Sequence, residues 1–353
     1  MSGFSAEAPM MLYYQRHDAP GAHNNSNVST RDLAVKVPPG LTPKPTPKEL
    51  HIPMVDAALY MRRRNPSSKA LGTFRRLQLP CLQFYFTSDF LNGAIPMVIT
   101  IILIISNMAL VWHQVGWCEY IFTLCMLATT FTMHFLTMSI DPGIYPRLCS
   151  GEKDPLEGHT QLVFCKECQL RRPPRCAHCY QCNVCVLEHD HHCSILGGCV
   201  GIRNLRWFTL YLLFCCSSTM IGVVWLARYL FNDLFINDEE NQTRLNEPLT
   251  PYPTMQGGRR SFATSDHSGS HLAAIVVLLL DGIVVMLVGL MLCIYVYLTL
   301  SSTTRRESMR KQNSLKVLLN PQKVWQNLKK VLSPPPSLLD SNDHADEEVT
   351  NLV

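Results

Sequence analysis

The chain has 353 residues, of which 47% are hydrophobic, and a formal net charge of +4 at pH 7. This length leaves room for two or three ordinary domains. The excess of basic residues is too small to indicate a nucleic-acid-binding protein, whose surface is strongly basic. The apolar residues are unevenly distributed, because long stretches carry almost no charge whereas both ends are polar and rich in Pro and Ser.

Residues 1–90 are predicted to form a cytosolic N-terminal region that is largely flexible. No signal peptide is predicted at the start of this sequence, because residues 1 to about 70 contain no apolar core segment. The stretch that follows mixes apolar and basic side chains, namely Phe74, Arg75, Arg76, Leu77, Leu79, Phe84, Tyr85 and Phe86. It fits either a segment lying along the membrane surface or a linker before a membrane span, and the sequence favours neither.

Four segments are long and apolar enough to be membrane spans. A bilayer core of about 30 Å requires roughly 20 apolar residues of helix, and residues 94–112, 117–140, 207–231 and 271–300 meet that requirement. Buried helices of a soluble protein are the alternative, but these segments are too long for it and have no polar faces. The predicted fold class is therefore an all-α integral membrane protein with four transmembrane helices.

Lys and Arg residues near the ends of the spans predict the orientation. They precede the first span, are frequent between the second and third, and follow the fourth, whereas the link between the first two has none. Residues 141–206, the tail 301–353 and both termini are therefore predicted to be cytosolic. The loop 232–270 has only three basic residues and is predicted to be lumenal; Asn241 begins an Asn-Gln-Thr glycosylation acceptor there.

Asp281 places an ionisable side chain inside the fourth predicted span. Burying a carboxylate in hydrocarbon is expensive, so Asp281 is predicted to face the other helices. Arg228, near the lumenal end of the third span, is the candidate partner in a structural pair.

Eight of the fifteen cysteines fall within one short segment: Cys165, Cys168, Cys176, Cys179, Cys182, Cys185, Cys193 and Cys199. Such a concentration is typical of metal binding in a reducing compartment rather than of disulfides. Two C-x-x-C pairs have the spacing that lets two thiolates reach one tetrahedral zinc ion. Because four histidines accompany the eight thiols, the segment predicts two zinc sites with groups left over. The alternative is a purely structural zinc module that docks partners.

The leftover groups include a candidate nucleophile and a candidate base. A thiol is mostly protonated at neutral pH, so a catalytic cysteine needs a base nearby. His191 lies two positions before Cys193, and Asp190 is placed to hold its other ring nitrogen and fix the tautomer. His189 and His192 satisfy that argument equally well, so the sequence alone leaves the choice of base open.

The run Asp190-His191-His192-Cys193 strongly resembles the signature of the DHHC protein S-acyltransferases, or palmitoyltransferases. The match extends over the C-x-x-C pairs, Arg-Pro-Pro-Arg at residues 172–175, His178-Cys179, Cys199-Val200-Gly201 with Asn204, and Asp141-Pro142-Gly143 after the second span. Four spans with the cysteine-rich segment in the central cytosolic loop match the family's architecture as well. The resemblance covers about residues 94–332.

The resemblance implies a role for each residue of the motif. It assigns one structural zinc ion to Cys165, Cys168, His178 and Cys185, and a second to Cys179, Cys182, His192 and Cys199. It leaves Cys193 as the nucleophile, His191 as the base and Asp190 as the residue that orients the base. Cys176 and His189 remain unassigned.

The resemblance also implies the reaction and the setting. A long-chain fatty acyl group such as palmitoyl would move from acyl-CoA to Cys193 and then to cysteines of target proteins. The implied partners are membrane lipid, acyl-CoA and proteins with cytosolic or juxtamembrane cysteines, and the implied location is the Golgi or endoplasmic reticulum membrane. Arg171, Arg172 and Arg175 are candidates for contacts with the CoA phosphates, although anionic lipid headgroups would suit them nearly as well.

Three positions beside the nucleophile depart from the family pattern. Relatives usually follow the catalytic cysteine with Pro-Trp and place Asn before the last zinc cysteine, whereas this chain has Ser194-Ile195 and Gly198. Ile195 would offer the first carbons of the acyl chain a smaller surface than Trp. Because the ligands and the Asp-His-His-Cys run are intact, we expect a divergent but active enzyme.

Two further motifs lie after the fourth span. The family's TTxE motif is imperfect, because Arg306 stands where Glu is expected and Glu307 comes one residue later. Residues 327–332 resemble the family's C-terminal Asn motif, which is a packing element. The alternative function is a catalytically silent zinc-bearing membrane scaffold. A transporter is a third option, but four spans with little intramembrane charge offer no obvious path.

Overall fold

The structure is a computed structural model that describes residues 56–62, 66–79, 82–112, 115–233, 268–309 and 317–339. All of them belong to one compact unit, Pro47–Val353. Most of the predicted flexible N-terminal region, nearly all of the predicted lumenal loop with its acceptor Asn241, and the end of the tail lie outside the described residues.

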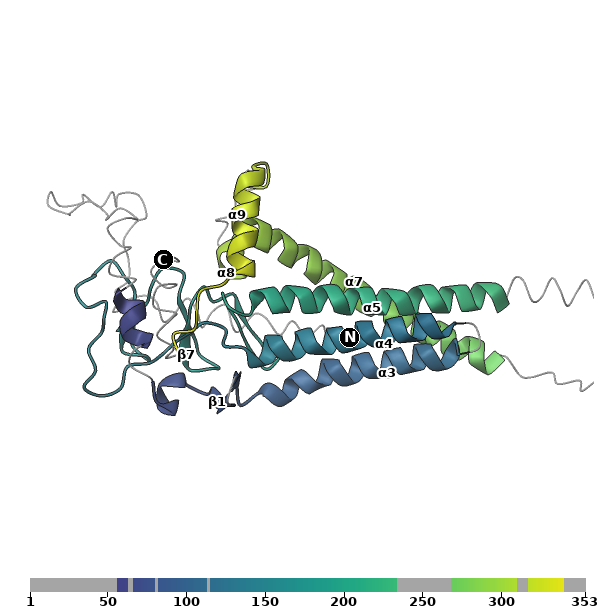
Figure 1. Cartoon of the computed structure of the whole chain (residues 1–353), viewed down its shortest axis with the longest axis horizontal. Helices are drawn as coiled ribbons and strands as arrows, with labels where there is room; N and C mark the ends of the chain where they lie inside the picture. Colours follow the sequence, from purple (N-terminus) through teal and green to yellow (C-terminus); the bar gives the residue numbers. More distant parts are fainter. Residues whose placement is uncertain are drawn as a thin grey trace, which may run out of the picture. The chain divides into compact units, whose positions relative to one another are not determined.

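Four helices of the described chain are long and apolar enough to cross a membrane. They are α3 (Ala94–Leu110), α4 (Trp117–Ser139), α5 (Leu205–Phe231) and α7 (Ser268–Ser301). Helix α5 packs against α4 and α7, and α3 contacts both α5 and α7 (Figure 1). Many of their large apolar side chains are exposed, as in Ile102, Phe122 and Met286. Helices that expose apolar side chains over such lengths belong in a lipid bilayer, and the chain is a multi-pass membrane protein.

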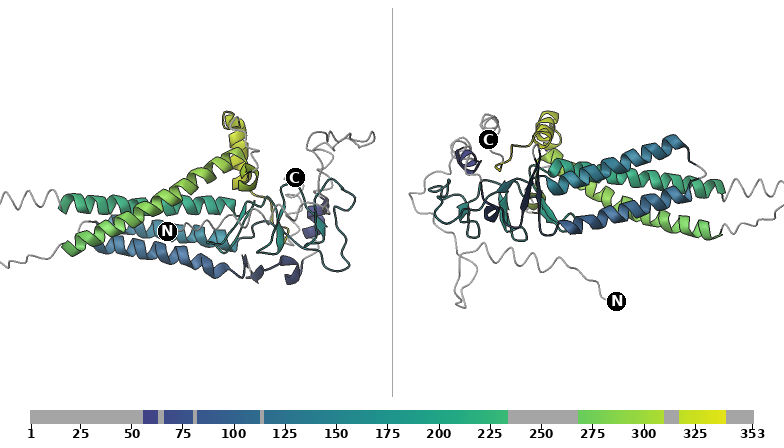
Figure 2. Two further views of the ribbon diagram at one scale, coloured as in Figure 1. Left: turned by 180° about the vertical axis from the view of Figure 1, so that it is seen from behind. Right: turned by 60° about the horizontal axis from the view of Figure 1, so that its bottom comes forward.

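The prediction of an all-α fold is wrong for residues 141–206, here called the cysteine-rich module. Its strands are β3 (Ile144–Tyr145), β4 (Phe164–Cys165), β5 (Leu170–Arg171), β6 (Ala177–Cys179), β7 (Val184–Val186), β8 (His191–Cys193) and β9 (Gly198–Val200). They form an antiparallel sheet of order β3-β7-β6 and the hairpins β4-β5 and β8-β9. The module lies at one end of the helices in all views (Figure 2).

The physical reason for the strands is the geometry of the C-x-x-C turns. In each, the residue after the second cysteine has a positive φ, 57° at Gln169 and 51° at Asn183. That left-handed residue reverses the chain, so β4 is followed by β5 and β6 by β7 as antiparallel partners. A helix would continue past the cysteines instead of returning across them.

The part of the N-terminal region that the structure describes is packed rather than free. Residues 56–62 are helical, and Met61 is fully buried against the cysteine-rich module. Leu71 and Phe74 lie in a core cluster with strand residues of the module. Gly72 has a φ of 65°, and a Cβ there would come within 2.2 Å of the carbonyl oxygen of Cys182, so only glycine fits this approach.

Two polar side chains fasten the module to the helices. Asp141 accepts hydrogen bonds from the backbone N–H groups of Gly143 and Ile144, at 2.8 and 2.7 Å, and pairs with Arg203 at 2.7 Å. Asn204, just before α5, donates to the carbonyl oxygens of Thr137 and Cys199 at 3.0 and 2.9 Å. The end of α4, the end of the module and the start of α5 are therefore held together.

The segment after α7 also packs on the module. Helices α8 (Arg305–Met309) and α9 (Pro321–Leu332) follow it, and Asn327 of α9 donates to the carbonyl oxygen of Leu300 at 2.7 Å. Beyond α9, Arg203 donates to the carbonyl oxygen of Pro335, and Leu338 and Leu339 are buried in the module's core clusters.

Asp281 faces other helices but has a different partner from the one predicted. Its carboxylate accepts a hydrogen bond of 2.8 Å from the amide of Asn107 on α3, and both side chains are buried. Gly222 of α5 makes the room, because a Cβ there would lie 2.6 Å from that amide nitrogen. Arg228 is exposed. Pairing Asp281 with Arg228 would bury a charged guanidinium group as well, and removing that charge from water is costly. The neutral amide of Asn107 avoids this cost and is the cheaper partner for a carboxyl group between helices.

Candidate active site and metal-binding clusters

Two groups of side chains could each hold a metal ion and are called the metal-binding groups; the first comprises Cys165, Cys168, His178 and Cys185. Their donor atoms all lie within 4.8 Å of one another, and all four residues are buried. The turn between β4 and β5 supplies Cys165 and Cys168, and the cross-strand pair of β6 and β7 supplies His178 and Cys185. His178 Nδ1 is 3.3 Å from the sulfur of Cys168.

The second group comprises Cys179, Cys182, His192 and Cys199, again with donor atoms within 4.8 Å of one another. His192 and Cys199 form a cross-strand pair of the hairpin β8-β9. His192 Nδ1 lies 3.3 Å from the sulfur of Cys182 and 3.6 and 3.7 Å from those of Cys179 and Cys199. Three thiols and one imidazole at such distances suit a closed tetrahedral site for a soft divalent ion.

Strand β8 separates the metal-binding histidine from its neighbours. Side chains alternate between the two faces of a strand, so His191 and Cys193 share one face and His192 points to the other. The other histidine that the sequence left open, His189, is buried beside Cys179. The structure therefore distinguishes the three candidates for the base, because only His191 lies next to Cys193 outside both metal-binding groups.

Asp190 and His191 are directly bonded. His191 Nδ1 donates to Asp190 Oδ2 at 2.8 Å, which leaves Nε2 of the same ring for Cys193. Burial by itself favours the neutral form of each group, but the contacts outweigh it. The hydrogen bonds with Asp190 and Cys193 raise the pKa of His191 to about 9, and His191 lowers the pKa of both Asp190 and Cys193. The arrangement favours a thiolate, an imidazolium and a carboxylate in a row.

Two groups at this site were not identified from the sequence. Tyr295 of α7 donates its hydroxyl to Asp190 Oδ2 at 2.9 Å and lies 3.0 Å from His191 Nδ1. The backbone N–H of Arg305 donates to Asp190 Oδ1 at 2.6 Å. The TTxE-like motif pointed to the segment of Arg305, but nothing local to Tyr295 in the sequence signals its role.

Cys193 lies where the module meets the ends of the helices. It is half-buried against a cluster that includes Phe208 and Leu212 of α5 and Leu298 of α7. The ring of Phe208 is 5.6 Å from that of His191. The thiol of Cys193 therefore lies between the polar side chains of Asp190 and His191 and the apolar ends of membrane helices.

Comparisons with known proteins agree with this geometry. A family model described as DHHC palmitoyltransferase matches residues 158–312, which include both metal-binding groups, Cys193 and Tyr295. Residues 158–312, the part of the chain that carries the candidate site, thus match the DHHC palmitoyltransferase family. The resemblance stated from the sequence is thereby confirmed.

Individual relatives match the same part of the chain. The chain is 34% identical to palmitoyltransferase ERF2 of Eremothecium gossypii, over 31% of its own length and 32% of that protein. It is 39% identical to probable protein S-acyltransferase 12 of Arabidopsis thaliana, over 26% and 35% of the two chains. It is also 39% identical to palmitoyltransferase ZDHHC8 of Homo sapiens, over 24% and 13%. The matches thus span about a third or less of these relatives.

The departure from the family's TTxE motif has a structural explanation. Thr304 precedes α8, and Glu307 occupies the third position of that helix. The backbone N–H of Thr304 donates to Glu307 at 2.8 Å, and that of Glu307 donates to the hydroxyl of Thr304 at 3.3 Å. This reciprocal pair is a capping box, which has Glu or Gln three positions after Ser or Thr. Glu307 therefore holds the turn that presents the N–H of Arg305 to Asp190.

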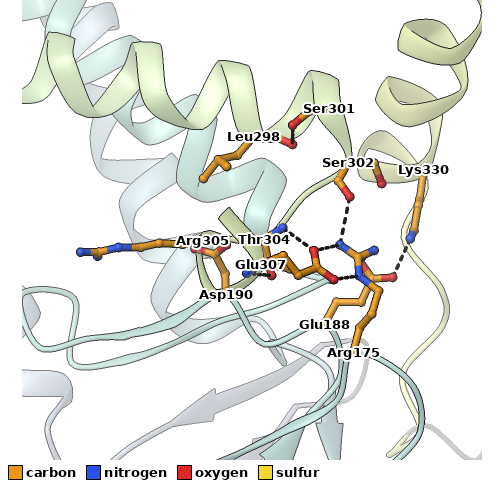
Figure 3. A network of polar contacts seen from close by, with 10 residues as sticks. All are labelled: Arg175, Glu188, Asp190, Leu298, Ser301, Ser302, Thr304, Arg305, Glu307 and Lys330. Carbon is orange, nitrogen blue, oxygen red and sulfur yellow. Dashed lines mark hydrogen bonds and ion pairs between the residues drawn. The ribbon is translucent and has the colours of Figure 1, made fainter. Parts of the chain in front are cut away.

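The three arginines suggested for CoA phosphates differ in their surroundings. Arg175 donates to Glu307 and Glu188, each at 2.7 Å, and to the carbonyl oxygen of Ser302 at 3.0 Å (Figure 3). Arg171 pairs with Asp154 at 2.9 Å. In contrast, Nε of Arg172 is buried without a hydrogen-bond partner among the described residues. Carboxylates of the chain thus occupy two of the three guanidinium groups.

The residues that replace Pro-Trp lie in a tightly held loop. Gly197 has a φ of 66°, and a Cβ there would come within 2.1 Å of the carbonyl oxygen of Asp89. The hydroxyl of Thr87 donates to the carbonyl oxygen of Gly197. Ile195 is 66% exposed, so its side chain points away from the protein. Gly198 has room for a side chain, since the nearest atom to a Cβ there is 3.7 Å away.

Proposed function

We propose that this protein is a protein S-acyltransferase that moves a long-chain fatty acyl group, such as palmitoyl, from acyl-CoA to cysteines of target proteins. The observation that carries the proposal is the position of Cys193 next to His191 and Asp190, outside both metal-binding groups and at the ends of the membrane helices. The printed names of the relatives, palmitoyltransferase and protein S-acyltransferase, support it.

The reaction follows from these groups in two steps. His191 takes the proton of Cys193, and the thiolate attacks the carbonyl carbon of the acyl-CoA thioester. The bond from that carbon to the CoA sulfur breaks, and CoA leaves with the proton from His191. In the second step His191 deprotonates a cysteine of the target protein, whose thiolate attacks the acyl group and releases Cys193.

Asp190, Tyr295 and Arg305 orient the base. Asp190 keeps the proton of His191 on Nδ1, so that Nε2 is free to exchange a proton with Cys193. The hydroxyl of Tyr295 and the N–H of Arg305 together donate to both oxygens of Asp190. These bonds favour the carboxylate, which in turn stabilises the imidazolium formed in each step.

Two zinc ions fit the two groups of ligands. The residues are Cys165, Cys168, His178 and Cys185 for one ion, and Cys179, Cys182, His192 and Cys199 for the other. In each group the thiols and the imidazole come from two hairpins of the module, so an ion held by them would cross-link those hairpins. Because four protein ligands would fill each site, the ions would have a structural role and the chemistry would fall to Cys193.

The membrane setting suits the substrate. Removing each methylene from water is worth about 0.8 kcal/mol, so a long acyl chain is best held between membrane helices with its thioester at the surface. Arg172 is the remaining candidate among the arginines for a CoA phosphate. We place the module and both termini in the cytosol and the protein in Golgi or endoplasmic reticulum membranes. Its protein substrates then carry cytosolic or juxtamembrane cysteines.

Labelling with an acyl-CoA tests the proposal directly. Purified protein incubated with a clickable palmitoyl-CoA analogue should acquire an acyl group that hydroxylamine removes. Cys193→Ser should abolish the label and retain the metal content, whereas Cys149→Ser, at an exposed cysteine outside the site, should retain both. A wild-type protein that acquires no label would favour the zinc-bearing scaffold instead.

A further inference from the structure

The β-hairpin before the first membrane helix has two different faces. It consists of β1 (Arg75–Gln78) and β2 (Gln83–Phe86), which the sequence left open between a surface segment and a linker. Cross-strand pairing puts Arg76 and Tyr85 on one face, and Tyr85 is buried in the core of the cysteine-rich module. The other face carries Leu77 opposite Phe84. One face of the hairpin therefore packs against the module, and the other face points away from it.

The second face contacts a membrane helix close to its end. The ring of Phe135 on α4 lies 5.4 Å from that of Phe84 and 6.3 Å from that of Phe86. Helix α4 ends at Ser139. Since each helical residue rises 1.5 Å, Phe135 lies about 6 Å inside the end of the helix. The apolar face of the hairpin is thus at the level where α4 leaves the bilayer.

The length of α3 gives a second measure of that level. Its 17 residues span about 26 Å, which is less than the hydrocarbon thickness of about 30 Å. The candidate membrane span begins with the short 3-10 helix η2 (Phe90–Gly93), which adds to this depth, and its Phe90 and Leu91 are exposed. The edge of the hydrocarbon therefore lies next to the end of β2, in agreement with the position of Phe135.

The hairpin extends this lipid-facing surface sideways. Leu77, Leu79 and Leu82 are 51%, 45% and 59% exposed. Leu79 and Leu82 exchange backbone hydrogen bonds of 2.8 and 3.4 Å, which extends the pairing beyond the strands. Arg75 on the same face is exposed, and its long side chain suits contact with lipid headgroups. An apolar surface of this kind, continuous with that of α3, matches lipid rather than water.

The hairpin is also fastened to the loop that follows the nucleophile. Thr87, directly after β2, donates to the carbonyl oxygen of Gly197, and Asp89 approaches Gly197 too closely for any Cβ. Ile195 of this loop is exposed. The contact between Thr87 and Gly197 therefore transmits the position of the hairpin to the backbone four residues after Cys193.

We propose that the β1–β2 hairpin and Ile195 form a lipid-contacting surface that enters the leaflet next to the cysteine-rich module and holds the loop after Cys193 at the edge of the hydrocarbon. The occupant of the surface is the acyl-chain region of that leaflet. The lipid contact itself does not depend on enzymatic activity, whereas its effect on acyl transfer rests on the proposed function.

Photo-crosslinking in a bilayer tests the contact. Benzoylphenylalanine is introduced singly at Leu77, Leu79, Leu82 and Ile195 of the full chain in phosphatidylcholine nanodiscs. The matched control is Val163, which is 57% exposed within the cysteine-rich module. Lipid adducts several times more abundant at the four positions than at Val163 are expected. Equal yields, absence of lipid adducts, or crosslinks to another protein chain would overturn the proposal.

Substitution tests the consequence for the nucleophile. The triple variant Leu77→Ser, Leu79→Ser, Leu82→Ser should autoacylate several-fold more slowly than the wild type in nanodiscs, but at the wild-type rate in detergent micelles, with unchanged zinc content. Val163→Ser should match the wild type in both media. An equal loss in both media would refute the membrane-dependent role. A wild type without autoacylation in either medium contradicts the proposed function and leaves the crosslinking test intact.

Discussion

The role inferred for Tyr295 rests on the distances from its hydroxyl to two residues of the candidate active site. Its hydroxyl is within hydrogen-bond distance of both Asp190 and His191, so it bonds to one and constrains the other. A hydrogen bond to a charged group contributes about 1.5–3 kcal/mol when its loss leaves the charge buried. Among residues remote in sequence from the Asp-His-His-Cys run, it has the clearest expected effect on rate.

Tyr295→Phe should therefore lower the single-turnover rate of autoacylation by roughly tenfold or more, with metal content unchanged. Rapid-quench labelling with saturating acyl-CoA measures that rate. Tyr297→Phe is the control, because Tyr297 packs on the same cluster. Equal rates in Tyr295→Phe and the wild type would show that the phenol does not orient the base.

The adjacent histidines of β8 provide the second test at this scale. His192 belongs to a metal-binding group and His191 to the opposite face of the strand. His191→Ala should retain about two zinc ions per chain and lose roughly 10²–10⁴-fold in autoacylation rate. His192→Ala should lose one ion and much of the folded protein. Metal analysis and labelling on the same samples separate the two, and loss of zinc from His191→Ala would contradict the assignment of faces.

At the scale of elements, α8 is placed by one carboxylate. Glu307 caps α8 and pairs with Arg175 of the module, so it links the turn that contacts Asp190 to the strands that carry the ligands (Figure 3). Burial tends to raise the pKa of Glu307, but its contacts with Arg175 and Thr304 lower it below the ordinary value of 4.5. The folded state therefore favours the ionised carboxylate.

The sign of the pH dependence follows from that shift. The ion pair stabilises the fold above pH 4.5, the ordinary value, and its contribution is lost as the pH falls through the lower pKa of the folded state. Glu307→Gln should lower stability by about 1 kcal/mol at neutral pH and by less in acid. Thermal unfolding in detergent at pH 7 and at pH 4 measures the difference. Glu157→Gln, at an exposed position, should have no effect; a difference for Glu307→Gln that grows in acid would refute the argument.

At the scale of the whole molecule, the orientation in the membrane is the open prediction. Basic residues gather on the side of the cysteine-rich module, which predicts that the module and both termini are in the cytosol. Tags at each terminus should be digested by protease added to intact microsomes, and a tag inserted after residue 241 should be protected. A protected terminus would reverse the orientation, whatever the state of Asn241.

Sequence alone sufficed for the four membrane helices and for two metal sites in the cysteine-rich segment, and the resemblance to the DHHC family supplied the two sets of ligands. Hydropathy is a sum over neighbouring residues, and C-x-x-C spacing is a local distance, so neither needs the tertiary structure. The resemblance assigned the base to His191, but the physical reason needed the structure: β8 turns His192 to its other face, and His189 is buried beside Cys179. The partners Tyr295 for Asp190 and Asn107 for Asp281 come from helices far away in the chain. Contacts at such separations depend on how the elements pack, and no local pattern of residues encodes them.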